Sequence, residues 1–135
     1  MSSAGSDPLA RKAHADIIVE RAAEQLRQLL HEAVALLDPF PPFPGAFFTF
    51  AIEVEPRATA SPEKGCLVVG PDAELYELVI GIDFSDESAD PVSARSEEMK
   101  KLDLHPADYL VYAYHALTRV TELLLEQAEA KGKGA

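Results

Sequence analysis

Side chains that could carry acid–base chemistry recur along one face of a predicted helix near the C-terminus. They are Asp108, Tyr112, His115 and Arg119, followed by Glu122 and Glu126. Spacings of three and four residues place them on one helical stripe, where His115 would act as general base and Arg119 would hold an anionic substrate. A solvated helix face explains the stripe better, because nothing in the sequence places a wall over it and catalysis needs a partly dry site.

A second group of possible ligands lies on the first predicted helix. Glu20, Glu24 and His31 share its polar side and could approach a metal ion. The Glu-x-x-His and His-Glu-x-x-His patterns that mark helical metal sites are absent from the chain. Surface pairing of Glu24 with Arg27 explains these residues equally well. We therefore expect no metal and no other cofactor.

The acidic segment after the third predicted strand offers the best spacing for a cation. Asp86, Ser88, Asp90 and Glu97 stand at positions 1, 3, 5 and 12 of a calcium-binding loop. Position 6 is Pro91, whose fixed φ cannot make the turn that glycine makes there, so an EF-hand is excluded. A looser cation site is one alternative, and it would comprise Asp83, Asp86, Glu87 and Asp90. A solvated loop is the simpler explanation.

The negative charge of the chain is concentrated in one region. The net charge is −11, and the segment from Asp72 to Glu98 holds nine acidic residues and one basic residue, a net charge of −8. Such a charge speaks against nucleic-acid binding, because phosphate is repelled. A docking patch for a basic protein partner is the alternative to a solvated surface. The patch would comprise Asp72, Glu74, Glu77, Asp83, Asp86, Glu87 and Asp90.

Phenylalanines cluster between the first helix and the first strand. Phe40, Phe43, Phe48 and Phe50 could line a pocket for an apolar ligand between the helices and the sheet. The same segment contains two PxxP patterns, but the flanking basic residues common in such ligands are absent. A rigid connector whose Phe40 and Phe43 cover the end of the core is the plainer alternative.

Other motifs exclude several classes of protein. The single cysteine, Cys66, opens a β-rich run without a nearby base, so we expect it to be buried and unreactive. The chain contains no phosphate-binding glycine loop, no nucleophile elbow and no Cys-x-x-Cys pattern. It also shows no basic segment followed by an apolar segment of the secretory type, and no apolar run near 18 residues. We expect a soluble, cytoplasmic protein that binds neither nucleic acid nor membranes.

Hydrophobic periodicity predicts two long helices around a small sheet. The first helix runs from Asp7-Pro8 to about Leu37, and the last from His105-Pro106 to about Ala130. Between them, alternation predicts strands over 47–55, 66–69 and 75–84, and a short helix over 92–102. The second and third strands should form a hairpin, because Pro71 suits a type I turn between them.

This order of elements defines a single α+β domain over residues 7–130. We expect an α-β-β-β-(α)-α chain in two layers, with a three-stranded antiparallel meander and both long helices packed on one face. Residues 1–6 should be a disordered N-terminus and residues 131–135 a flexible C-terminal tail.

Two apolar surfaces exceed what this fold needs. The apolar arc of the last helix is about 200° wide, so this helix should touch the sheet and either the first helix or a second subunit. Its central seam comprises Leu110, Tyr114, Leu117, Val120, Thr121, Leu124 and Ala128. The far face of the sheet should be covered by residues 85–104 or by a symmetric partner. Its predicted residues are Phe47, Ala51, Leu75, Val79 and Gly81.

The sequence therefore favours a small acidic protein that acts by protein contact, as an adaptor or chaperone-like homodimer without enzymatic activity. The first alternative is a small apolar-ligand binding protein, or a minor enzyme, that uses the phenylalanine-lined pocket. The second is a protein with a divalent-cation-binding loop.

Overall fold

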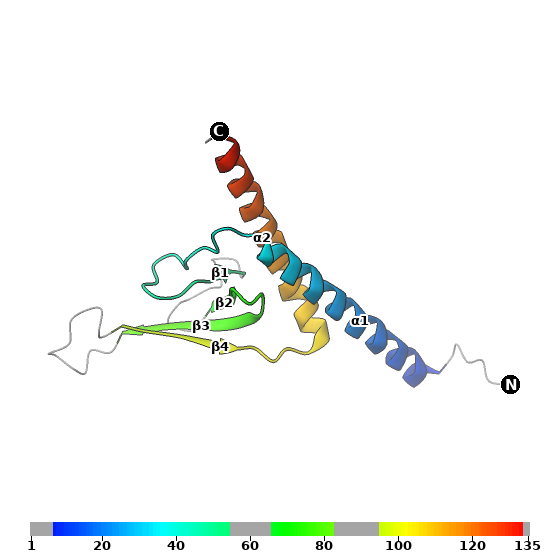
Figure 1. Ribbon diagram of the computed structural model, residues 1–135. Helices are drawn as coiled ribbons and strands as arrows, with labels where there is room; N and C mark the ends of the chain where they lie inside the picture. The colour runs from blue at the N-terminus through cyan, green and yellow to red at the C-terminus, as the bar shows by residue number, and fades with distance from the viewer. Residues whose placement is uncertain (1–6, 55–65, 83–94, 134–135) are drawn as a thin grey trace.

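The chain folds into two long helices and a four-stranded antiparallel sheet (Figure 1). The computed structural model describes residues 7–54, 66–82 and 95–133. Its elements are α1 (Pro8–Ala35), β1 (Ile52–Glu53), β2 (Cys66–Val69), β3 (Leu75–Ile82), β4 (Arg95–Lys101) and α2 (Pro106–Lys133). The helices pack on the sheet, so the α+β class expected from the sequence is confirmed.

Both helices begin where the sequence predicts. The Asp7 carboxylate accepts hydrogen bonds from the backbone N–H groups of Leu9 and Ala10, at 3.0 and 3.4 Å. At the start of α2, the Nδ1 atom of His105 accepts a hydrogen bond from the N–H of Ala107, at 3.4 Å. Each cap satisfies N–H groups that the first helical turn leaves without a partner.

The strands follow each other in the sheet in chain order, as a meander. The predicted hairpin of β2 and β3 is confirmed: Cys66 pairs with Leu78, and the Ala73 N–H donates to the Gly70 carbonyl at 2.9 Å. The strand predicted over 47–55 is shorter at its start, because pairing with β2 begins at Ile52, and Glu55 lies outside the described residues. The residues before it are bound instead by side chains of β4, as described below.

The short helix predicted over 92–102 is wrong for residues 95–101, which form β4. This strand pairs with β3 along its whole length, from Tyr76–Lys101 to Ile82–Arg95. A run of Glu, Met and Lys has good helix propensity, but a full ladder against an existing strand outweighs that weak preference. Residues 83–94, with the expected helix start at Asp90-Pro91, lie outside the described residues.

Different parts of the chain cover the two faces of the sheet. Val54, Val69 and Leu75 belong to the cluster under the helices, so Leu75 faces the helices and not the far side, contrary to the prediction. The far face carries the second cluster, which comprises Phe43, Ala51, Cys66, Val68, Leu78 and Ile80. The proline- and phenylalanine-rich segment therefore covers the far face, where we expected residues 85–104 or a second subunit.

Helix α2 packs against both α1 and the sheet. Its buried residues are Tyr109, Ala113, Ala116 and Val120. The predicted seam was thus rotated around the helix, since Tyr114 is 62% exposed. Alanines at the contact allow α1 to approach closely. Of the two partners that the sequence left open for this helix, the first helix or a second subunit, the first helix therefore covers its buried face.

Candidate functional site

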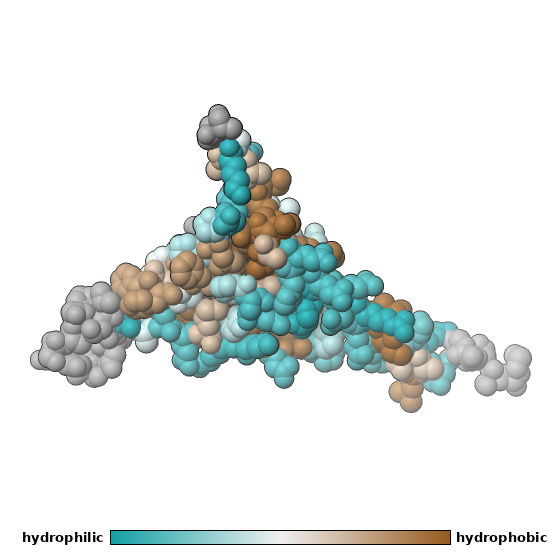
Figure 2. Space-filling view, viewed as in Figure 1, coloured by the Kyte–Doolittle hydropathy of each residue, from teal (hydrophilic) through white to brown (hydrophobic). Residues whose placement is uncertain are grey.

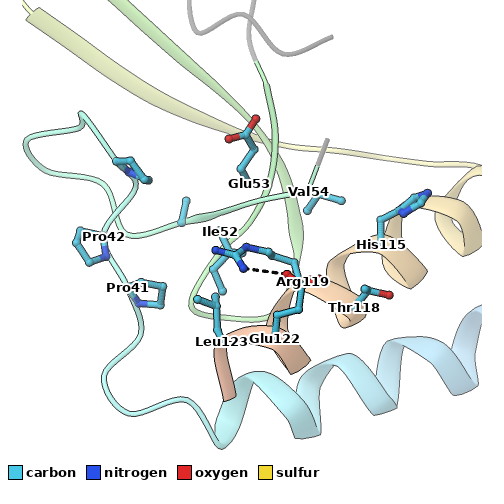
Figure 3. Close-up of a pocket in the computed structure, with 12 residues that line it drawn as sticks. Pro41, Pro42, Ile52, Glu53, Val54, His115, Thr118, Arg119, Glu122 and Leu123 are labelled. Atoms are coloured by element: carbon cyan, nitrogen blue, oxygen red, sulfur yellow. Dashed lines mark hydrogen bonds and ion pairs between the residues drawn. The ribbon is translucent and has the colours of Figure 1, made fainter. Parts of the chain in front are cut away.

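A groove of about 430 Å³ lies between the edge strand β1 and helix α2 (Figure 3). Its lining residues are Pro41, Pro42, Pro44, Ala51, Ile52, Glu53, Val54, His115, Thr118, Arg119, Glu122 and Leu123. The volume is within the range of roughly 300–1,000 Å³ usual for ligand pockets. Apolar walls and a few charged side chains share the surface, which is the usual composition of a binding site.

Helix α2 supplies the polar wall of this groove. His115, Arg119 and Glu122 are four and three residues apart, so one side of the helix presents all three. The Arg119 guanidinium lies 2.9 Å from the Glu122 carboxylate and 3.9 Å from that of Glu126. No wall over this face is visible in the sequence, but in the structure the proline segment and β1 lie opposite its His115–Glu122 part.

The proline segment is fixed to the end of α2. The Gln127 side chain accepts a hydrogen bond from the Asp38 N–H at 3.0 Å and donates one to the Pro39 carbonyl at 2.9 Å. Farther along, the Phe43 N–H donates to the Thr49 carbonyl at 2.9 Å. These bonds set the distance between the prolines and α2, and so the width of the groove at this end.

Strand β1 supplies the opposite wall, and it is an edge strand of the described sheet. The Val54 N–H donates to the Leu67 carbonyl on β2 at 2.9 Å. Backbone groups of neighbouring residues in a strand point to opposite sides. The N–H and C=O groups of Glu53 therefore point away from β2, toward the open edge.

The four predicted catalytic residues do not form one site. His115 and Arg119 line the groove, whereas Asp108 lies in the first turn of α2 and Tyr112 packs half-buried against the main core. The His115 ring is exposed and contacts the ring edge of Tyr114, with centroids 5.8 Å apart. Asp108 and Tyr112 are outside the groove lining, so they cannot assist His115 there.

The predicted pocket phenylalanines are likewise distributed over different surroundings. Phe40 packs against the main core and Phe43 is buried in the second cluster. Phe48 and Phe50 are 65% and 53% exposed. None of the four lines the groove.

Glu53 and the prolines line the groove but were not predicted as site residues from the sequence. The one available signal was the position of Glu53 on a predicted strand that follows a proline segment.

The described members of the predicted acidic patch make contacts inside the chain. Glu74 lies 2.6 Å from Arg27 of α1, 3.9 Å from His31 and 3.8 Å from Lys101, and so ties the helix to the sheet. Asp72 accepts hydrogen bonds from the Tyr76 hydroxyl and the Glu74 N–H. Glu77 faces Lys100 across the β3–β4 ladder. The other members, Asp83, Asp86, Glu87 and Asp90, lie outside the described residues.

Glu97, placed by the sequence in a calcium-type loop, is a buried structural carboxylate. Its side chain is 2% exposed and accepts hydrogen bonds from the N–H groups of Phe47 and Phe48, at 2.6 and 3.0 Å. Thr49 and Arg95 donate two more, at 2.7 and 3.2 Å. Burial alone would raise the pKa of Glu97, but these bonds outweigh it and hold the pKa below its ordinary value.

Two further candidates can be placed. Cys66 is 5% exposed, and burial, with a smaller effect of the Glu53 and Glu77 carboxylates, raises its pKa to about 11. Such a thiol is a poor nucleophile. Glu20, Glu24 and His31 remain on α1, and His31 is directed to Glu74. Within residues 7–54, 66–82 and 95–133, no three His, Cys, Asp or Glu side chains gather closely enough to hold a metal ion.

Comparisons with known proteins add no information on function. No family model, curated protein or solved structure matches this chain. In the described part of the chain, neither helix is long and apolar enough to cross a membrane.

Proposed function

We propose that the protein is a homodimer that acts by contact with other proteins, without catalysis of its own. The observation that carries this proposal is the outer face of the helix layer, which remains apolar after α1 and α2 have packed together. Its exposed members are Ile18 and Leu29 on α1, Leu36 at the C-cap of α1, and Val111, Tyr114 and Leu125 on α2.

Each helix gathers these residues on one stripe. Ile18, Leu29 and Leu36 are eleven and seven residues apart, close to whole numbers of turns, and their stripe lies away from the buried Leu30 and Val34. Both helices run in the same general direction, because Arg27 stacks on Tyr109 and Asp38 bonds to Gln127. On each helix the stripe lies on the side away from the buried residues, and Figure 2 shows apolar residues along α2 and in the N-terminal half of α1.

The first half of α1 also lacks a partner within the described chain. The buried residues of this helix are Ala23, Leu30 and Val34, and none lies between residues 8 and 22. Helical segments of about 15 residues are marginal in water unless an apolar face is packed. Contact with a second copy would supply that packing.

The exposure of these side chains is high for large apolar residues. The six residues are 51–69% exposed. Exposed apolar side chains that gather on one face are typical of interaction sites, and a twofold arrangement would cover the same face on both copies.

Measurement of mass in solution tests the proposal. We expect light scattering and sedimentation to give a dimer at about 100 μM, a dimer that persists in high salt because its contact is apolar. The double variant Ile18→Glu, Leu29→Glu should be a folded monomer, since both side chains are exposed and the core is untouched. Gln28→Glu, which adds a charge on another side of α1, should remain dimeric. A wild-type monomer at that concentration would overturn the proposal.

The two alternatives lack a comparable observation. The four phenylalanines predicted to line a pocket are absent from the lining of the groove, and the predicted cation-binding residues lie outside the described part of the chain. The acidic surface with a basic partner remains a component of the proposal, because the net charge of −11 favours association with positively charged proteins.

A further inference from the structure

The groove beside β1 combines an open strand edge with a helix wall. Glu53 directs its backbone N–H and C=O toward the open edge, and Ile52 and Val54 form the floor. Across the groove stand Thr118, Arg119 and Leu123 on α2. A strand edge beside a helix is a geometry in which extended peptides bind, through main-chain hydrogen bonds and alternate side-chain contacts.

We infer that this groove binds an extended segment of a partner protein, which adds to β1 as a further strand. The inference rests on the proposed action by protein contact and names the partner's chemistry. Among residues 7–54, 66–82 and 95–133, the pairing along this edge ends at Phe50, which forms a bridge with Pro42. Pro41, Pro42 and Pro44 border the groove and have no N–H group that could donate to the Glu53 carbonyl.

The side-chain directions on β1 define the sequence pattern of the segment. Glu53 pairs with Val68, a residue of the far-face cluster, so its side chain points to the far face. Ile52 and Val54 point to the helices. The side chain of a peptide residue opposite Glu53 would also point to the far face. The side chains of the two peptide residues that flank it would point toward Ile52, Val54 and Leu123. In Figure 3 the Glu53 carboxylate accordingly points away from α2.

Charge selects the central residue of the segment. On the groove side, the Glu122 carboxylate already binds the Arg119 guanidinium at 2.9 Å, whereas the Glu53 carboxylate lies on the far-face side of β1. Among the described residues, Glu53 makes no ion pair. Opposite charges that face each other across two strands stabilise the pair. The preferred pattern is therefore apolar–basic–apolar, which agrees with a basic partner for an acidic protein.

The probe is the pentapeptide acetyl-Ser-Val-Lys-Val-Ser-amide, titrated into ¹⁵N-labelled protein and followed by amide chemical shifts. We expect saturable shifts centred on residues 51–54 and 115–123, with a Kd near 1 mM because only one residue of β1 supplies hydrogen bonds. The same peptide with a methyl group on the backbone nitrogen of its lysine cannot donate to the Glu53 carbonyl, and should bind at least about threefold more weakly. Glutamate in place of the lysine should weaken binding about fivefold.

A charge exchange supplies the matched control. Glu53→Lys should prefer the glutamate peptide to the lysine peptide, whereas Glu98→Lys, the same change on an exposed position of β4, should keep the wild-type preference. Equal affinity for the N-methylated peptide would overturn strand addition. Shifts confined to other surfaces, or none at about 5 mM peptide, would overturn the site.

The same titration separates this inference from the proposed dimer. The Ile18→Glu, Leu29→Glu variant changes α1, outside the groove, and should still bind the peptide as a monomer. Peptide binding without a dimer would leave the groove assigned and refute only the self-association. A dimer without peptide binding would do the opposite.

Discussion

Replacement of Glu97 by alanine should cost more stability than any other single carboxylate change in the described chain. The variant leaves the N–H groups of Phe47 and Phe48 without their acceptor, and leaves the Arg95 guanidinium, 18% exposed, without its counter-ion. Removal of one partner of a buried ion pair costs about 3–5 kcal/mol. The two N–H groups can bind water once the loop opens, so they should add little to the cost of the lost ion pair. We therefore expect a total loss of stability within that range.

The loss should also be visible in the covering of the far sheet face. Glu97 holds residues 47–49 on the sheet, and this segment carries Phe43 and Ala51 onto Cys66 and Leu78. Its release would expose that cluster. Cys66 should therefore become accessible to thiol reagents in the variant before global unfolding.

Urea unfolding followed by circular dichroism measures the effect. Glu97→Gln keeps an acceptor oxygen but loses the charge, and should cost about 1.5–3 kcal/mol, the usual value of hydrogen bonds to a charged group. Glu98→Ala, on the exposed side of the same strand, should change stability by less than about 0.5 kcal/mol. If Glu97→Ala and Glu98→Ala were equally stable, the anchoring role of Glu97 would be refuted.

The pH dependence of stability has a sign that follows from the same contacts. The pKa of Glu97 is lower in the folded protein than its ordinary value of 4.5. The unfolded chain therefore binds a proton first as the pH falls. The stabilisation is fully present above pH 4.5 and is lost as the pH falls below it, through the folded pKa. Glu97→Gln should flatten this part of the stability profile.

Two further perturbations test single contacts. Glu74→Gln should destabilise the protein by about 1–2 kcal/mol in urea unfolding, because it weakens the bond to Arg27 that joins α1 to the sheet. The control Glu24→Gln changes an exposed carboxylate 4.0 Å from Arg27 and should cost under about 0.5 kcal/mol. Equal effects of the two variants would refute the role of Glu74 in joining α1 to the sheet. Cys66, with its pKa near 11 and its burial, should react with iodoacetamide at pH 8 at least about a hundredfold more slowly in the native protein than in urea; equal rates would show that the thiol is accessible.

Local signals were sufficient for the parts of the fold that depend on neighbouring residues. The Asp7 cap, the His105-Pro106 start and the β2–β3 hairpin each follow from a few adjacent side chains, and each is present. The strand β4 was missed because its own residues favour a helix. Its actual conformation is set by pairing with β3, a partner up to 25 residues away, as in Tyr76–Lys101.

The site could be predicted only in part for the same reason. The stripe of His115, Arg119 and Glu122 was visible in the helical spacing, but its opposite wall comes from the proline segment, more than 70 residues earlier. Glu97 meets Phe47 across 50 residues of sequence. A single sequence gives no pairing between such distant segments, so an acidic residue that binds backbone N–H groups looks like any other acid.

The groove and the outer helix face meet at Thr118, so we expect occupation of the proposed dimer face to affect occupation of the groove. Val111, Thr118 and Leu125 are seven residues apart, about two turns, and so lie on one stripe of α2. Thr118 lines the groove, while Val111 and Leu125 are 54% and 62% exposed on the face assigned to the second copy. A second copy seated there would lie beside the open side of the groove.

Linkage then requires that the peptide and the second copy affect each other by the same factor. If the second copy adds a wall to the groove, the pentapeptide should bind more tightly as protein concentration rises through the dimer dissociation constant, and should in turn strengthen the dimer. If it narrows the entrance, both effects reverse sign. Peptide titrations above and below that concentration, repeated on the Ile18→Glu, Leu29→Glu monomer, measure the factor directly. An affinity that is the same in dimer and monomer would refute the shared border at Thr118.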